Sequence, residues 1–159
     1  MPLISSLGVM NAMGFGFSSS LKSQYIALAH STTPFISAYP WSSGFGTKYA
    51  QPAESFYSYG SQFNKLGNYI AVSAYSSPYI YAYQWSNGWG TKYSDPATLP
   101  SGAGAKINFS PAGTEIAIAH STTPFISTYP WSSGFGSKYS NPATLPTGTG
   151  RSEIGRAHV

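Results

Sequence analysis

The sequence predicts an all-β protein made of tandem antiparallel units of four strands each. Three observations predict this. One block of sequence recurs along the chain, Gly and Pro punctuate it at regular places, and no 3.6-residue apolar period competes with two-residue alternation. With 42% hydrophobic and 16% aromatic residues, the chain of 159 residues is rich enough in apolar surface to form a packed core.

The repeat is the strongest signal. Residues 26–53 and 116–143 are identical at 23 of 28 positions, and a more divergent copy occupies residues 70–97. The equivalent residues Ile26, Ile70 and Ile116 are therefore 44 and 46 positions apart. A spacing in the mid-forties is typical of one four-stranded blade of a β-propeller. The expected divisions are a leading segment from a preceding blade at 1–16, blade repeats at 17–56, 57–100 and 101–146, and a non-repeat tail at 147–159.

The first two strands of each unit are clearest in the third copy. Residues 106–110 alternate between polar and apolar side chains and predict a strand, which ends at a turn where Gly113 can adopt a positive φ. The next strand is expected at residues 115–120. It has isoleucines on one face and small alanines on the other, so a neighbouring sheet can approach the alanine face closely.

The last two strands follow two further turns. Residues 125–129 are rich in β-branched and aromatic side chains and predict the third strand, which ends at Trp131. A turn at 132–134 leads into a short outer strand at 135–139. The prolines of residues 141–146 then indicate a connection to the next unit, because proline cannot donate a ladder hydrogen bond.

These residues carry a resemblance to a known family. The run Phe109-Ser110-Pro111-Ala112-Gly113, followed by Ile116-Ala117-Ile118 and by a strand ending Tyr129-Pro130-Trp131, resembles a divergent tryptophan-aspartate (WD) repeat. The resemblance covers most of residues 17–146. It departs from the family pattern in having no opening Gly-His pair and no terminal Asp. What the resemblance implies is a β-propeller that acts as a protein-interaction scaffold.

Three repeats predict a section of a larger ring. Propellers close with about four to eight blades, so three blades leave two apolar faces bare, and the isolated chain is expected to be poorly soluble or oligomeric. The repeat is abandoned near Arg151, and residues 154–159 read as one frame of the sequencing-library adapter ATCGGAAGAGCACACGTC. We therefore interpret the tail from about residue 151 as adapter-derived.

Composition argues against several classes of partner. The formal charge of +4 arises from eight cations and four anions scattered singly, which does not favour nucleic-acid binding. No segment reaches the roughly 18 to 20 continuous apolar residues of a membrane span. Residues 3–17 lack the positive n-region of a signal peptide and are interpreted as a leading strand. The absence of cysteine excludes disulfides and thiolate metal sites.

Catalysis is not predicted. His30 and His120 occupy the same repeat position, but the middle copy has Ala74 there, and the acidic residues stand at non-equivalent places. The recurring Gly-x-Gly-Thr/Ser-Lys motif lacks the following helix of a phosphate loop. We therefore expect no catalytic, metal or cofactor site.

The recurring aromatic residues allow two interpretations. Packing between blades is favoured, and the alternative is an exposed rim that stacks on sugars or on partner side chains, with a lysine at each blade edge. The candidate interaction surface comprises Trp41, Trp85, Trp89, Trp131, Lys48, Lys92 and Lys138.

The primary hypothesis is a non-enzymatic protein-interaction or structural scaffold, whose partner is another protein or further blades of the same array. The alternative is a carbohydrate- or surface-recognition module of an extracellular or virion-associated protein. A propeller-type lactonase or hydrolase is less favoured, because residues unique to single blades would have to converge at its centre.

Overall fold

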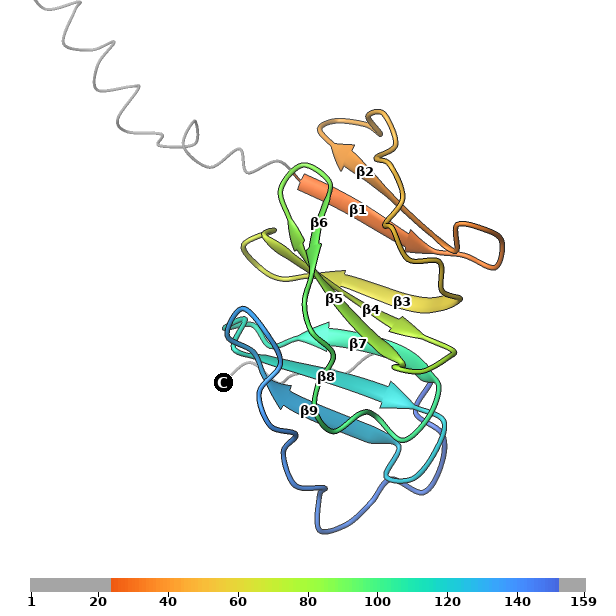
Figure 1. The fold of residues 1–159 in the computed structure, drawn as a ribbon, viewed down its shortest axis with the longest axis vertical. Helices are drawn as coiled ribbons and strands as arrows, with labels where there is room; N and C mark the ends of the chain where they lie inside the picture. The colour runs from red at the N-terminus through yellow and green to blue at the C-terminus, as the bar shows by residue number, and fades with distance from the viewer. Residues whose placement is uncertain (1–23, 152–159) are drawn as a thin grey trace, which may run out of the picture.

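The computed structural model describes residues 24–151, so the expected leading segment and the tail beyond Arg151 lie outside it. The described residues contain nine strands (Figure 1). These are β1 (Gln24–Ala29), β2 (Ile36–Trp41), β3 (Ser58–Phe63), β4 (Tyr69–Ala74), β5 (Ile80–Trp85), β6 (Trp89–Lys92), β7 (Gly104–Phe109), β8 (Glu115–His120) and β9 (Ile126–Pro130). Within this part of the chain, no helix is long and apolar enough to cross a membrane.

The strands form three antiparallel sheets, one for each copy of the repeat. Sheet 1 is β1-β2, sheet 2 is β3-β4-β5-β6 and sheet 3 is β7-β8-β9, each in sequence order. The all-β prediction is confirmed. The pairing register of the second and third strands of the repeat is the same in all three sheets. Ile26 lies opposite Tyr39, Ile70 opposite Tyr83 and Ile116 opposite Tyr129.

The boundaries of the first three strands of the third copy differ from expectation by two residues at most. Strand β8 has the predicted bounds, β9 begins one residue late, and β7 begins two residues early at Gly104. The turn between β7 and β8 contains Gly113 with φ of 75°, as predicted. The hydroxyl of Ser110 closes this turn by accepting the backbone N–H groups of Thr114 and Glu115.

The predicted outer strand forms only in the middle copy, as β6. In the other two copies it is reduced to single bridges, Trp41 with Phe45 and Trp131 with Phe135. The reason is a proline. The chain after each bridge still donates to the third strand, for example from Gly136 to the carbonyl of Pro130. However, Pro40 and Pro130 replace Gln84 and have no N–H to donate back, so the ladder is interrupted.

The three sheets are stacked in series (Figure 1), with β3 against β1 and β7 against both β3 and β4. The two faces of sheet 2 serve different neighbours. Ile70 and Val72 belong to the core shared with sheet 1, whereas Ala71 and Ala82 belong to the core shared with sheet 3. The close approach predicted for the alanine face of the second strand is therefore confirmed in sheet 2.

The two sheet-to-sheet junctions share polar contacts at equivalent positions. The hydroxyl of Tyr83 donates to Glu54 Oε2 at 2.9 Å, and that of Tyr129 donates to the carbonyl of Thr98 at 2.9 Å. Each bond ties the third strand of one sheet to the connection leaving the preceding sheet. Burial raises the pKa of Tyr129 to about 12, so the phenol keeps its donor proton at neutral pH.

Candidate functional site

Of the four tryptophans in the predicted interaction surface, Trp85 and Trp131 are buried between sheets. Trp131 contacts four aromatic rings edge-on. The partners are Tyr69 at 5.4 Å, Tyr93 at 5.1 Å, Phe109 at 5.7 Å and Phe135 at 5.1 Å. Trp85 makes the equivalent contacts one junction earlier, with Tyr25, Tyr49, Phe63 and Trp89. Both side chains therefore pack between sheets and are not presented on the surface.

The other two tryptophans are partly exposed. Trp89 lies edge-on to Tyr83 at 5.2 Å and to Trp85 at 5.3 Å, at the outer edge of sheet 2. Trp41 lies on sheet 1, where its ring contacts Phe45 at 5.0 Å. The structure thus does not gather the four tryptophans into one surface.

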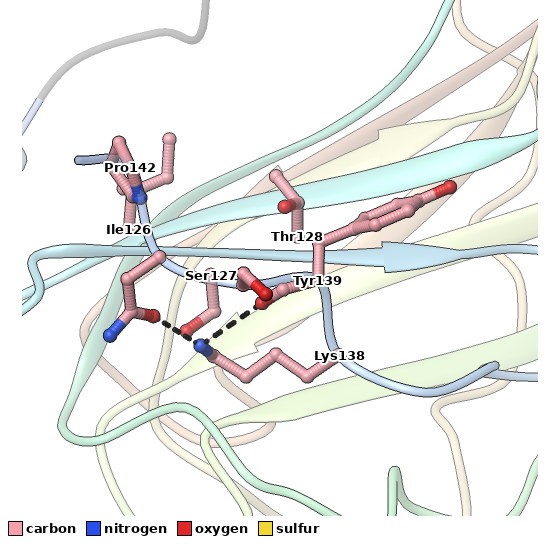
Figure 2. A pocket seen from close by; sticks show the side chains of 8 residues that line it. Ile126, Ser127, Thr128, Lys138, Tyr139 and Pro142 are labelled. Atoms are coloured by element: carbon pink, nitrogen blue, oxygen red, sulfur yellow. Dashed lines mark hydrogen bonds between the residues drawn. The ribbon is translucent and has the colours of Figure 1, made fainter.

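Two of the three lysines of the predicted interaction surface bond to the chain segment that follows their own sheet. Lys92 Nζ forms an ion pair with Asp95 Oδ1 at 2.7 Å and lies 5.2 Å from the ring centroid of Tyr81. Figure 2 shows the equivalent Lys138, whose ammonium donates to Asn141 Oδ1 at 2.6 Å. Lys48 is exposed on sheet 1.

Two small clefts contain three of these predicted residues. Lys138 lines a cleft of about 260 Å³ along β9 (Figure 2). Trp89 and Lys92 line another, of about 340 Å³, together with Glu54 of the preceding connection. The clefts belong to different sheets, so these residues form separate local sites and not a continuous rim.

The histidines are hydrogen-bonded to serines within their own sheets. His120 Nε2 lies 3.0 Å from Ser127 Oγ, and His30 Nε2 lies 3.0 Å from Ser37 Oγ. In the middle copy Ala74 stands in place of the histidine and Tyr81 in place of the serine. The large side chain is therefore on the third strand of that sheet instead of at the end of the second. This exchange indicates a packing role for the position.

Because His120 is buried, its pKa is lowered, although the backbone of Thr122 and of Ile126 opposes the shift. Below the ordinary histidine pKa of about 6.5, the unfolded chain therefore binds a proton that the folded chain excludes. We expect the free energy of unfolding to fall as the pH is lowered through this range. Urea unfolding of the parent and of His120→Gln measures the effect, and the variant should lose less stability on acidification. His30→Gln is the matched control, and an unchanged pH dependence in His120→Gln would contradict the prediction.

The sequence reading missed a groove of about 700 Å³ between sheets 2 and 3. Its walls come from the start of the first strands, from the loops after the second strands of these sheets, and from Thr149 and Arg151 in the chain that follows sheet 3. The lining residues are Tyr59, Tyr75, Ala103, Gly104, Ala105, Ser121, Thr149 and Arg151. We call this cavity the tyrosine groove.

The tyrosine groove exists because the middle copy carries tyrosines where the third copy carries small residues. Tyr59 and Ala105 occupy the same place, an irregular residue in the first strand of each sheet where the register shifts. Such bulges redirect a side chain out of the regular pleat. Likewise Tyr75 corresponds to Ser121, and both donate their backbone N–H to equivalent carbonyls, those of Tyr57 and Ala103.

Tyr59 and Tyr75 line one side of the groove, and the ring of Tyr57 packs against both. The ring of Tyr57 lies 5.1 Å from that of Tyr59 and 6.3 Å from that of Tyr75, in edge-to-face geometry. Nevertheless Tyr59 is 51% exposed and Tyr75 is 57% exposed. The rings therefore fix each other's orientation while leaving aromatic surface and hydroxyl groups open to a ligand.

No family model matches the chain, and no curated protein sequence matches it. Among residues 24–151 there is also no group of three or more His, Cys, Asp or Glu side chains placed to hold a metal ion.

Proposed function

We propose that the chain is an array of β-propeller blades that acts as a protein-interaction scaffold, with the tyrosine groove as its binding surface. Three antiparallel sheets in sequence order, stacked in series with repeated junction contacts, support the blade architecture. The resemblance to WD repeats supports the same architecture. The proposed activity is binding and not catalysis.

The proposal rests on where the copies of the repeat differ in their aromatic residues. Among the aromatic residues shared by the copies, Trp85 and Trp131 are buried in the junctions, whereas Tyr139 at the end of the series is exposed. The tyrosines unique to the middle copy instead stand open beside a groove. Tyrosine supplies a large contact area with few rotatable bonds and is enriched at protein interfaces. A unique, exposed cluster on a repetitive framework is therefore the surface best suited to a specific partner.

A neutral carbohydrate is the second candidate ligand. Exposed rings of Tyr59 and Tyr75 offer faces for stacking on a sugar, and the hydroxyl residues Ser121 and Thr149 line the same groove. Thr149 Oγ1 lies 3.4 Å from the carbonyl of Ser121, so these residues are also held together. This arrangement suits a ligand that combines apolar faces with hydroxyl groups.

Peptide display and a glycan array, both probed with the full chain, test the proposal. We expect selected peptides to bind, and the double substitution Tyr59→Ser/Tyr75→Ser to weaken them about tenfold or more, because aromatic anchors dominate such interfaces. Tyr59→Phe/Tyr75→Phe separates the contribution of the rings from that of the hydroxyls.

The control is Leu66→Ser, which removes an exposed apolar side chain at the turn between β3 and β4, at the far end of β3 from Tyr59. Peptide binding that survives the double serine substitution would overturn the proposal. Glycans bound in place of peptides, with the same sensitivity to the double substitution, would assign the groove to the carbohydrate alternative.

A further inference from the structure

Sheets 1 and 3 stand at the two ends of the series, and each exposes a face whose equivalent is buried between sheets elsewhere in the structure. Sheet 1 presents the face that sheets 2 and 3 bury against their predecessors. Leu28 is 57% exposed, whereas the equivalent residues Val72 and Ile118 are fully buried. Trp41 is likewise partly exposed, although its counterparts Trp85 and Trp131 are buried. We call this surface of sheet 1 the leading face.

Sheet 3 exposes the face that is equivalent to the one sheet 2 buries against sheet 3. Tyr139 is 47% exposed, whereas its counterpart Tyr93 packs edge-on against Trp131 with a centroid distance of 5.1 Å. Ile126 is also partly exposed, although the equivalent Ile80 is fully buried under sheet 3. We call this surface the trailing face. It matches the surface of sheet 2 that receives Trp131.

The backbone at Gly150 already follows the path of a further sheet. A Cβ atom at Gly104 would lie 3.0 Å from Ser73 Cβ and 2.7 Å from the carbonyl oxygen of Tyr79, which shows how closely β7 approaches sheet 2. A Cβ atom at Gly150 would meet the equivalent atoms of sheet 3. It would lie 2.8 Å from Ala119 Cβ and 3.0 Å from the carbonyl oxygen of Phe125. The trailing face is thus arranged to receive another sheet in the same way.

We propose that the leading face of one copy of this chain docks on the trailing face of a second copy, so that Trp41 packs against the partner's Tyr139. The inference rests on the blade architecture proposed above and extends the two existing junctions to a third. The two faces are different surfaces, so the contact is head-to-tail and generates either a closed ring or an open fibre. Thr128 replaces Ala82 on the trailing face, and this added polarity suits an interface between separate chains.

Sedimentation velocity on the full chain tests the proposal. We expect a species larger than the monomer whose proportion rises with protein concentration. Leu28→Glu on the leading face and Tyr139→Glu on the trailing face change exposed side chains, so both variants should fold, as checked by circular dichroism. Each should weaken self-association about tenfold or more, because a buried unpaired charge opposes docking.

Mixing the two variants is the decisive measurement. The intact leading face of Tyr139→Glu can still dock on the intact trailing face of Leu28→Glu, so the mixture should recover an assembly that neither variant forms alone. Leu66→Ser, outside both faces, should assemble like the parent. A parent chain that stays monomeric at all concentrations, or a mixture that does not recover, would overturn the head-to-tail contact. Peptide binding by the tyrosine groove in the same samples reports separately on the proposed function.

Discussion

Replacing Trp131 with alanine is expected to lower the free energy of unfolding by about 3 to 5 kcal/mol, as is usual for truncating a large buried aromatic residue. The side chain is buried and has rings of both adjoining sheets around it, Tyr69 and Tyr93 on sheet 2 and Phe109 within sheet 3. Its removal would leave a cavity in the junction that rigid strands cannot collapse to fill. Urea unfolding followed by tryptophan fluorescence and circular dichroism measures the loss.

Trp41→Ala is the matched control, because Trp41 holds the same repeat position on sheet 1 and is partly exposed. We expect a loss of about 1 kcal/mol, since less apolar area leaves water on folding. Both variants should be compared at low concentration, where self-association through the leading face contributes least. Equal losses would show that the packing of Trp131 between two sheets contributes nothing beyond the local contacts of the repeat.

Much of the fold could be predicted because the same alternation of apolar residues recurs in the copies of the repeat. Alternation placed Ile116 and Ile118 on one face of a strand, and both are buried where that face meets sheet 2. The alanines of the equivalent strand in sheet 2 meet the next sheet, as their small size indicated. Where three copies carry the same apolar residue in the same phase, packing decides the outcome and local sequence reveals it.

The outer strand shows where a similarity between copies misleads. The three copies are similar in the sequence of this segment, but its pairing depends on the neighbouring strand. The replacement of Gln84 by Pro40 and Pro130 removes the N–H that a continued hydrogen-bonded ladder would need. The prolines were a signal that could have been read, because a strand that contains proline can be paired regularly on one side only.

The tyrosine groove could not be predicted from the repeat. Tyr57 and Tyr59 precede the block in which the copies are most alike, and the groove depends on the third copy having alanine at the equivalent places. Its two sides come from different copies, so it exists only once the sheets are stacked. Predicting it would have required the register of one sheet against the next, which alternation within a strand does not contain.

Gly104→Ala is expected to lower the free energy of unfolding by about 2 to 3 kcal/mol, the cost of inserting a methyl group into a closely packed site. The added Cβ atom would lie 2.7 Å from the carbonyl oxygen of Tyr79 and 2.7 Å from Ile118 Cδ1. The isoleucine can turn aside, but the carbonyl belongs to the backbone beside β5, so the sheets themselves would have to separate. Thermal and urea unfolding of the variant measure the cost.

Gly148→Ala provides the control, because no atom lies within 4 Å of the position that its Cβ would occupy. This substitution also removes a flexible glycine from the unfolded chain, so we expect a change within about 1 kcal/mol of zero, of either sign. A large loss at Gly104 with none at Gly148 would mean that close backbone approach stabilises the stacking of the sheets. Equal small effects would instead mean that the sheets can slide apart at low cost. In that case the contact of Gly150 with sheet 3 would no longer support the docking of a second copy.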